Sequence, residues 1–259
     1  MHKPLILVTN DDGIGAPGVR ALVRFMKEIG EVVVVAPDSP QSGMGHAITL
    51  DNALYPKKVI PDPDHGAKEE YSCSGTPADC VKMALQVFLE KRPDICISGI
   101  NHGSNSSINV IYSGTMSAAI EAGIEGIPAI GFSLCDYNWE ADFEPSKPFI
   151  QKIVREALKN GIPQGVVLNV NIPKLIDIQY KGIKICRQAR ANWKEKFDKR
   201  RSPSGRDYYW LTGEFELLDD GQDTDEWALS QGYISVVPTQ FDLTAHHTIE
   251  QLTKWNLNG

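Results

Sequence analysis

One stretch near the start of the chain decides the fold: residues 5–18 read LILVTNDDGIGAPG. Its first four residues form an unbroken apolar run, which is typical of a strand buried on both faces. Apolar residues then recur at helical spacing between Pro17 and Gly30, which suit the start and the stop of a helix. The strand-to-helix turn places Asp11 and Asp12 at the carboxyl end of the strand, where open α/β sheets bind ligands.

The same turn also matches a dinucleotide-binding pattern. Residues 13–18 fit G-x-G-x-x-G between a strand and a helix, and Asp38 follows about twenty residues later. Two features disfavour a pyrophosphate here: the carboxylates of Asp11 and Asp12 would repel it, and Pro17 lacks an N–H donor. A metal site at the carboxylates is therefore favoured, with an NAD-dependent oxidoreductase as the alternative.

Size, charge and cysteine usage restrict the class of protein. A chain of 259 residues can form one large α/β domain, with or without an appendage. A net charge of −7 argues against a protein that tracks nucleic acid. No stretch has the length of a membrane-spanning helix, so no membrane partner is expected. The five scattered cysteines never form C-x-x-C, which indicates reduced thiols and a cytoplasmic location.

Beyond the first turn, strands and helices alternate along the chain. The expected strands are residues 32–35, 94–98, 129–134, 166–172 and 183–186. Helices are expected after a capping box at Thr76 and Asp79, after a cap at Ser113 or Thr115, and over residues 149–159. This alternation predicts an α/β fold. We expect a Rossmann-like three-layer α/β/α sandwich with a mostly parallel sheet as the catalytic core, residues 1–189.

The C-terminal quarter is expected to form a β-hairpin and helix arm for oligomerisation. Residues 190–207 are charged and read as irregular, whereas 208–211 and 233–237 read as the strands of a ribbon, followed by a helix over 249–257. A two-stranded ribbon is only marginally stable alone, and exposed aromatic strands pair with partners. We therefore expect at least a homodimer that exchanges the arm, residues 190–259, between subunits.

Four loops are expected to meet at one edge of the sheet. They hold Asp11 and Asp12, Ser42, the asparagine-rich segment 101–105, and the helix start at 113–115. Taken singly, Ser42 reads as a turn residue and the helix start as an ordinary cap. Together the first three loops offer hard oxygen ligands suited to Mg²⁺ or Mn²⁺, and the fourth offers backbone N–H groups for an anion. A metal beside an anion site predicts phosphoryl transfer to water.

Five sequence blocks, in this order, resemble the SurE family of stationary-phase survival nucleotidases. The blocks are NDDG at 10–13, APD at 36–38 with SG at 42–43, GTPADC at 75–80, SGIN at 98–101 with Gly103 and Asn105, and YSGT at 112–115. The resemblance covers nearly the whole chain. It implies a metal-dependent phosphatase acting on nucleoside 5′- and 3′-monophosphates, and some members also trim polyphosphate.

The resemblance also implies roles for individual residues. One divalent metal ion per subunit, Mg²⁺ or Mn²⁺, is expected at Asp11, Asp12, Ser42 and Asn101, and both aspartates are expected to be catalytic. Phosphate and substrate contacts are expected at Asn105, Ser113, Gly114 and Thr115. The family further implies a dimer with an exchanged C-terminal arm, often a dimer of dimers, and no nucleic-acid polymer beyond the trimming of ends.

One segment departs from the family pattern. Where the family commonly reads Leu-Gly-acid-Asp-Val, residues 106–110 read SSINV, so the acidic charge is missing and the base preference is open. Attack by a metal-activated water is favoured for the reaction, and a covalent aspartyl-phosphate is the alternative. A nucleotide sensor without turnover is the non-catalytic alternative.

Overall fold

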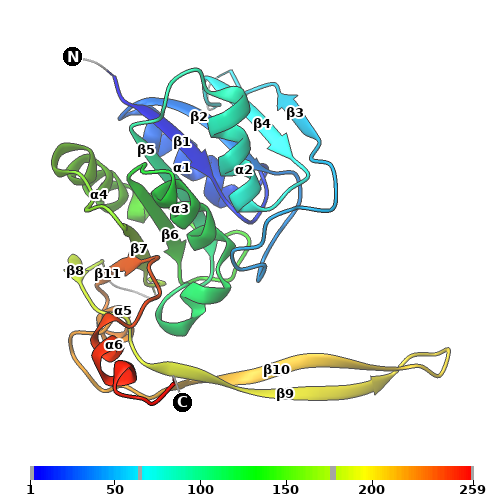
Figure 1. The fold of residues 1–259 in the computed structure, drawn as a ribbon. Helices are drawn as coiled ribbons and strands as arrows, with labels where there is room; N and C mark the ends of the chain where they lie inside the picture. The colour runs from blue at the N-terminus through cyan, green and yellow to red at the C-terminus, as the bar shows by residue number, and fades with distance from the viewer. Residues whose placement is uncertain (1–2, 64–65, 176–178, 258–259) are drawn as a thin grey trace.

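The computed structural model describes residues 3–63, 66–175 and 179–257. These residues form a nine-stranded central sheet with helices on both faces, and a two-stranded hairpin that projects from the body (Figure 1). The predicted α/β class with a mostly parallel sheet is confirmed. No helix among the described residues is long and apolar enough to cross a membrane.

The strands occur in the chain as β1 (Leu5–Thr9), β2 (Glu31–Pro37), β3 (Pro56–Val59), β4 (Glu69–Cys73), β5 (Ile95–His102), β6 (Ala129–Leu134), β7 (Val166–Ile172), β8 (Ile183–Ile185), β9 (Ala191–Arg201), β10 (Asp207–Leu217) and β11 (Ile234–Gln240). The helices are α1 (Pro17–Lys27), α2 (Pro77–Met83), α3 (Gly114–Ile124), α4 (Lys147–Asn160), α5 (Asp225–Ser230) and α6 (His246–Thr253). The order across the central sheet is β3-β4-β2-β1-β5-β6-β7-β11-β8. Neighbours are parallel except at β3–β4 and β7–β11.

Strand β1 shows how the two faces of the sheet are covered. Ile6 and Val8 belong to the apolar cluster that includes residues of α1 and α4, whereas Leu7 belongs to the cluster that includes residues of α2 and α3. Side chains alternate between the faces of a strand, so an unbroken apolar run is buried on both. The result is a three-layer sandwich with a separate core on each side of the sheet.

The predicted helix starts are confirmed in detail. Thr76 accepts a hydrogen bond from the Asp79 backbone N–H, and the Asp79 carboxylate accepts one from the Thr76 N–H, which completes a capping box. At the start of α3, Ser113 rather than Thr115 is the N-cap, because its hydroxyl accepts from the Met116 N–H at 3.0 Å.

The prediction for the C-terminal quarter was partly wrong. Residues 190–207, expected to be irregular, contain β9, which pairs with β10 in an antiparallel hairpin of eleven residue pairs. The hairpin is exposed on both faces, so its strands lack the apolar alternation that marks a half-buried strand. Ion pairs join the two strands instead, such as the one between Lys199 and Asp207 at 2.7 Å. The segment 233–237 does not pair with 208–211; it enters the central sheet as β11.

Gly18 allows α1 to approach β5. A Cβ atom at this position would lie 2.0 Å from the carbonyl oxygen of Ile100, a backbone atom that cannot move aside cheaply. At Gly15, in the same turn, a Cβ would meet nothing within 4 Å. The glycine pattern of this turn is therefore partly a packing requirement between a helix and a strand.

We expect Gly18→Ala to lower the free energy of unfolding by about 3 kcal/mol, or roughly 10 °C in Tm, because the helix must shift away from β5. Gly15→Ala is the matched control and should change the free energy by less than about 0.5 kcal/mol. Thermal unfolding followed by circular dichroism measures both variants. Equal Tm values for the two variants would contradict the close approach.

Candidate active site

Asp11 lies directly after β1, beneath the N-terminus of α3. Asp11 is 4% exposed to solvent, and the Thr115 hydroxyl donates a hydrogen bond to its Oδ1 at 2.5 Å. Gly114 packs on the same side chain, since a Cβ there would lie 2.7 Å from the Asp11 Cβ. Burial raises the pKa of Asp11 to about 6, although the Thr115 hydrogen bond opposes the shift, and the neighbouring Asp12 carboxylate adds to it. A cation at this carboxylate would offset the cost of its buried charge.

Asp12 is held by the end of β5. Its Oδ2 accepts from the backbone N–H of His102 at 3.3 Å and lies 3.1 Å from His102 Nδ1. The His102 side chain is only 7% exposed, and it is sandwiched between this carboxylate and aromatic residues. The contact joins the turns that follow β1 and β5, which are neighbouring parallel strands.

The asparagine-rich segment after β5 is fixed by its own hydrogen bonds. The Asn101 amide donates from Nδ2 to the Gly103 carbonyl at 2.8 Å, so the amide oxygen remains as the group that can bind a cation. Asn105 is 7% exposed and donates from Nδ2 to Ser133 Oγ on β6 at 2.8 Å. The backbone of Asn105 bonds to two buried asparagines of β7, Asn169 and Asn171, at 2.8 Å each.

The loop with Ser42 reaches the site through its backbone. The N–H of Gln41 donates to the Asp11 carbonyl at 2.7 Å, and Ser42 itself is exposed. Further along the loop, His46 Nε2 lies 2.8 Å from Glu121 Oε2 on α3. Hydrogen bonds from His46 and Lys82 lower the pKa of the Glu121 carboxyl, against the effect of burial. This contact fastens the Ser42 loop to the helix that covers Asp11.

The residues predicted for the site thus come to one edge of the sheet, with differences in detail. Asp11, Asp12, Asn101 and Asn105 follow β1 or lie at the end of β5, and the residues 113–115 lie over Asp11. The Ser113 hydroxyl acts as the helix cap and the Thr115 hydroxyl bonds to Asp11. The N-terminus of α3 therefore already stabilises a negative charge, that of Asp11.

The residues present fit a divalent cation. Two carboxylates, a hydroxyl and an amide oxygen are hard donors of the kind that Mg²⁺ and Mn²⁺ bind. Beside them, Asn10 Oδ1 and His102 Nε2 are buried and lack a hydrogen-bond partner among the described residues, so they can bond to waters that a cation brings. Within those residues no three His, Cys, Asp or Glu side chains are grouped to hold a metal. The candidate site therefore depends on Ser42 and Asn101 as well as the aspartates.

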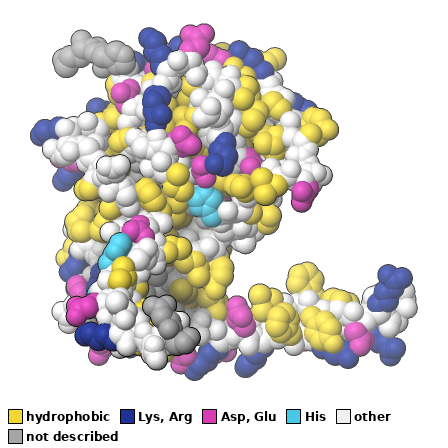
Figure 2. Space-filling model, viewed as in Figure 1, with side chains coloured by type: hydrophobic (Ala, Val, Ile, Leu, Met, Phe, Trp, Pro, Cys, Tyr) yellow, Lys and Arg dark blue, Asp and Glu magenta, His cyan; other side chains and the backbone are white. Residues whose placement is uncertain are grey.

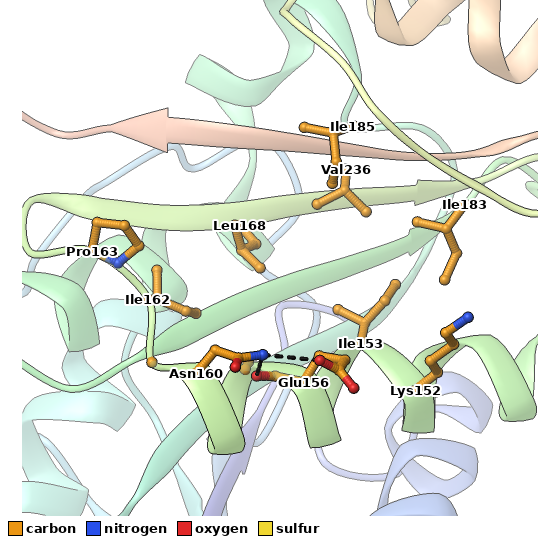
Figure 3. A pocket seen from close by; sticks show the side chains of 12 residues that line it. Lys152, Ile153, Glu156, Asn160, Ile162, Pro163, Leu168, Ile183, Ile185 and Val236 are labelled. Carbon is orange, nitrogen blue, oxygen red and sulfur yellow. Dashed lines mark hydrogen bonds between the residues drawn. The ribbon is translucent and has the colours of Figure 1, made fainter.

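A separate apolar pocket lies between α4 and the β7–β11–β8 end of the sheet (Figure 3). It has a volume of about 390 Å³ and is lined mainly by aliphatic side chains, among them Ile153, Leu168 and Val236. Its polar residues Asn160 and Glu156 bond to each other. None of the predicted site residues lines it, so it is separate from the candidate site.

The sequence analysis missed two residues of β7 that hold the backbone of Asn105 in place. Asn169 and Asn171 alternate along β7, whose other residues are apolar, and both are almost fully buried. Polar side chains on a buried strand need hydrogen-bond partners, so this alternation was a readable signal. The contact of His102 with Asp12 has no such signal, because no sequence feature places the imidazole against that carboxylate.

Together, the fold and this geometry define an α/β protein whose candidate metal ligands lie at the carboxyl edge of a mostly parallel sheet. The chain belongs to the SurE family: residues 6–195 match the family model described as Survival protein SurE. It is 68% identical to the protein named 5′-nucleotidase SurE of Flavobacterium johnsoniae over 258 residues, which cover 100% of this chain and 99% of that protein. The protein with the same name in Phocaeicola vulgatus is 46% identical, over 99% of this chain and 98% of that one.

A solved structure agrees with the fold. The crystal structure of the SurE protein from Aquifex aeolicus superposes with a TM-score of 0.82 at 41% sequence identity. The match covers 96% of this chain and 98% of that one, so the similarity includes the C-terminal region as well as the sheet.

The buried charge of Asp11 gives a pH-dependent prediction for the metal-free protein. The pKa of Asp11, about 6, lies above the ordinary value of 3.8, so the native state loses stability as the pH rises through this interval. Asp11→Asn removes the charge and keeps an oxygen for Thr115. Above about pH 7 the variant should be more stable by up to about 3 kcal/mol, and below about pH 4 the difference should vanish.

The control for this measurement is Asp79→Asn. Hydrogen bonds from Thr49 and Thr76 outweigh the effect of burial and lower the pKa of Asp79, so its charge stabilises the native state at neutral pH and is lost on acidification. Asp79→Asn should therefore destabilise the protein at neutral pH. Urea unfolding in the presence of EDTA measures both variants, and a destabilised Asp11→Asn at neutral pH would contradict the argument.

Proposed function

We propose that the protein is a SurE-type 5′-nucleotidase that hydrolyses nucleoside 5′-monophosphates, and also 3′-monophosphates, to nucleoside and phosphate with the help of a divalent metal ion. The activity is supported by relatives named 5′-nucleotidase SurE that match the full chain. The observation that carries the metal-dependent mechanism is the buried Asp11 carboxylate, held against the N-terminus of α3 next to a second carboxylate.

In this proposal Asp11, Asp12, Ser42 and Asn101 hold one Mg²⁺ or Mn²⁺ ion per subunit. The ion would supply Lewis acidity, which withdraws charge from the phosphate and lowers the pKa of water. Thr115 fixes the orientation of Asp11.

His102 fixes the orientation of Asp12. The phosphate is bound by Asn105 and by the helix start at Ser113, Gly114 and Thr115, where backbone N–H groups favour anions.

We favour water over an aspartate as the nucleophile. Asp11 Oδ1 accepts the Thr115 hydroxyl at 2.5 Å, and Gly114 packs against the rest of the carboxylate. Asp12 is also engaged, through His102. A carboxylate that is fixed by several contacts can bind a cation, but it is poorly placed to move into line for attack on phosphorus. Phosphate trapped covalently on either aspartate after rapid quenching would refute this choice.

The alternatives have less support. The dinucleotide pattern of residues 13–18 is accounted for in part by packing, since Gly18 meets Ile100, and two carboxylates stand where a pyrophosphate would lie. A sensor without turnover would bind nucleotides and release no phosphate. The five cysteines are all free thiols, which supports the cytoplasmic location that belongs to the same proposal.

The test of the proposal is phosphate release from a panel of nucleoside monophosphates, with added Mg²⁺ or Mn²⁺ and with EDTA. We expect EDTA to abolish release and Asp12→Asn to lower kcat at least about a hundredfold, because the variant loses a charged metal ligand. Asp51→Asn, an exposed carboxylate outside the site, is the matched control and should leave kcat unchanged. Titration of Mn²⁺ by calorimetry should show weakened binding in Asp12→Asn alone. Near-normal turnover of Asp12→Asn at saturating metal would overturn the assignment.

We also propose that the projecting hairpin mediates a homodimer, and that two such dimers can associate into a dimer of dimers. Hydrophobic side chains lie along the hairpin, well away from the body (Figure 2). Phe197, Trp210 and Leu211 are each more than half exposed. Isolated ribbons of two strands need a surface to cover them. The division into a core, 1–189, and an arm, 190–259, remains part of this proposal, although β11 of the arm pairs within the central sheet.

Sedimentation velocity tests the dimer. The full chain should sediment as a dimer or larger at micromolar concentration, and Trp210→Lys should shift it toward the monomer because a buried charge at the interface is costly. Tyr55→Lys, an equally exposed aromatic on the body, should not change the distribution. A fully active monomer of the unaltered chain would contradict the proposal.

A further inference from the structure

Two aromatic side chains stand exposed beside the site, on the segment that follows β6. Tyr137 is 76% exposed and Trp139 is 55% exposed. Neither has a part in the proposed chemistry, and large exposed aromatics close to a polar site are a typical sign of ligand contact. Their position relative to the catalytic loops decides what they can bind.

Both rings rest on the loop between the candidate metal and phosphate ligands. The Trp139 indole stacks on His102, with ring centroids 5.1 Å apart and planes 17° apart. The Tyr137 ring covers Gly103, where an added Cβ would lie 2.3 Å from a ring carbon. Because His102 Nδ1 is 3.1 Å from Asp12, one imidazole ring separates the indole from a catalytic carboxylate.

Hydrogen bonds and an ion pair hold the segment that carries these rings. The Asp136 carboxylate accepts from the Asn138 N–H at 3.0 Å and pairs with Lys174 at 3.0 Å. The Asn138 side chain in turn accepts from the Glu140 N–H at 3.1 Å. Phe143, which is buried, packs its edge on His102 at 5.2 Å. The two rings are therefore held in place before any ligand binds, which lowers the entropic cost of stacking.

The charges around the rings indicate which part of a nucleotide they face. Glu140 and Asp142 are exposed acidic residues on the same segment. They disfavour a phosphate beside the rings, while the N-terminus of α3, which lies on Asp11, favours one there. A neutral heterocycle fits the aromatic side.

We propose that Tyr137 and Trp139 form the nucleobase-binding part of the site, a stacking surface for the base of a nucleotide whose phosphate lies at Asp11 and α3. This inference rests on the proposed nucleotidase function. Stacking on aromatic rings accepts every base, because each has a π face, and it favours the larger purines. The platform therefore predicts broad base specificity with a preference for purine nucleotides over pyrimidine nucleotides.

The test compares two substrates that share a phosphate and a ribose, adenosine 5′-monophosphate and ribose 5-phosphate. In the full-length protein, Trp139→Ala should lower the ratio of their kcat/KM values by about tenfold, mainly through KM of the nucleotide. Trp139→Phe keeps a ring and should restore most of the ratio. Tyr55→Ala, an exposed aromatic remote from this segment, should not change it. A ratio unchanged in Trp139→Ala would overturn the proposal.

A second measurement is independent of turnover. Adenosine should quench tryptophan fluorescence in the EDTA-treated protein, and the quenching should disappear in Trp139→Phe. If the protein hydrolyses no phosphate ester yet adenosine still quenches Trp139, the nucleotidase proposal fails and the stacking surface stands. If Trp139→Ala changes the sedimentation coefficient and not the substrate ratio, the rings contact a second copy of the chain, and the stacking surface is refuted.

Discussion

The burial of the Asp11 carboxylate is the constraint on which the rest of the site depends. A buried charge is tolerated only when hydrogen bonds, dipoles or an opposite charge compensate it. Here part of the compensation comes from α3, and it requires the helix start to lie directly on the carboxylate. The Ser-Gly-Thr sequence of that helix start meets the requirement: Ser113 caps the helix, Gly114 permits the close approach, and Thr115 donates the hydrogen bond.

The parallel sheet gathers the other components. The order β2-β1-β5-β6-β7 places the carboxyl ends of five strands side by side, and the chain order reverses direction at β1, which lies between β2 and β5. The five strands place the carboxylates after β1, the Ser42 loop after β2, Asn101 at the end of β5 with Asn105 after it, the aromatic segment after β6 and the buried asparagines on β7. The site is thus a property of strand order, and no two of these elements are adjacent in the sequence.

Local chemistry made much of this arrangement predictable. The strand-to-helix turn at 5–18, the capping box at Thr76 and the helix start at 113–115 follow from short local patterns, and the structure confirms these three helix starts. The contact of His102 with Asp12 was not predictable, because it depends on the register between β1 and β5. The first strand of the long hairpin, β9, was missed for a different reason. Strands exposed on both faces bury no apolar stripe, so their sequence resembles that of a charged loop.

The place of the hairpin in the chain has a consequence for how this fold can change in evolution. The hairpin begins after β8 and the chain returns to the sheet as β11, and these two strands are hydrogen-bonded neighbours. Topologically, the hairpin together with α5 is therefore an insertion between two adjacent strands, with both ends fixed in one sheet. Insertions at such a point add little entropic cost as they lengthen. The hairpin can accordingly grow, shrink or alter its surface without changing the order of the strands whose carboxyl ends carry the candidate site.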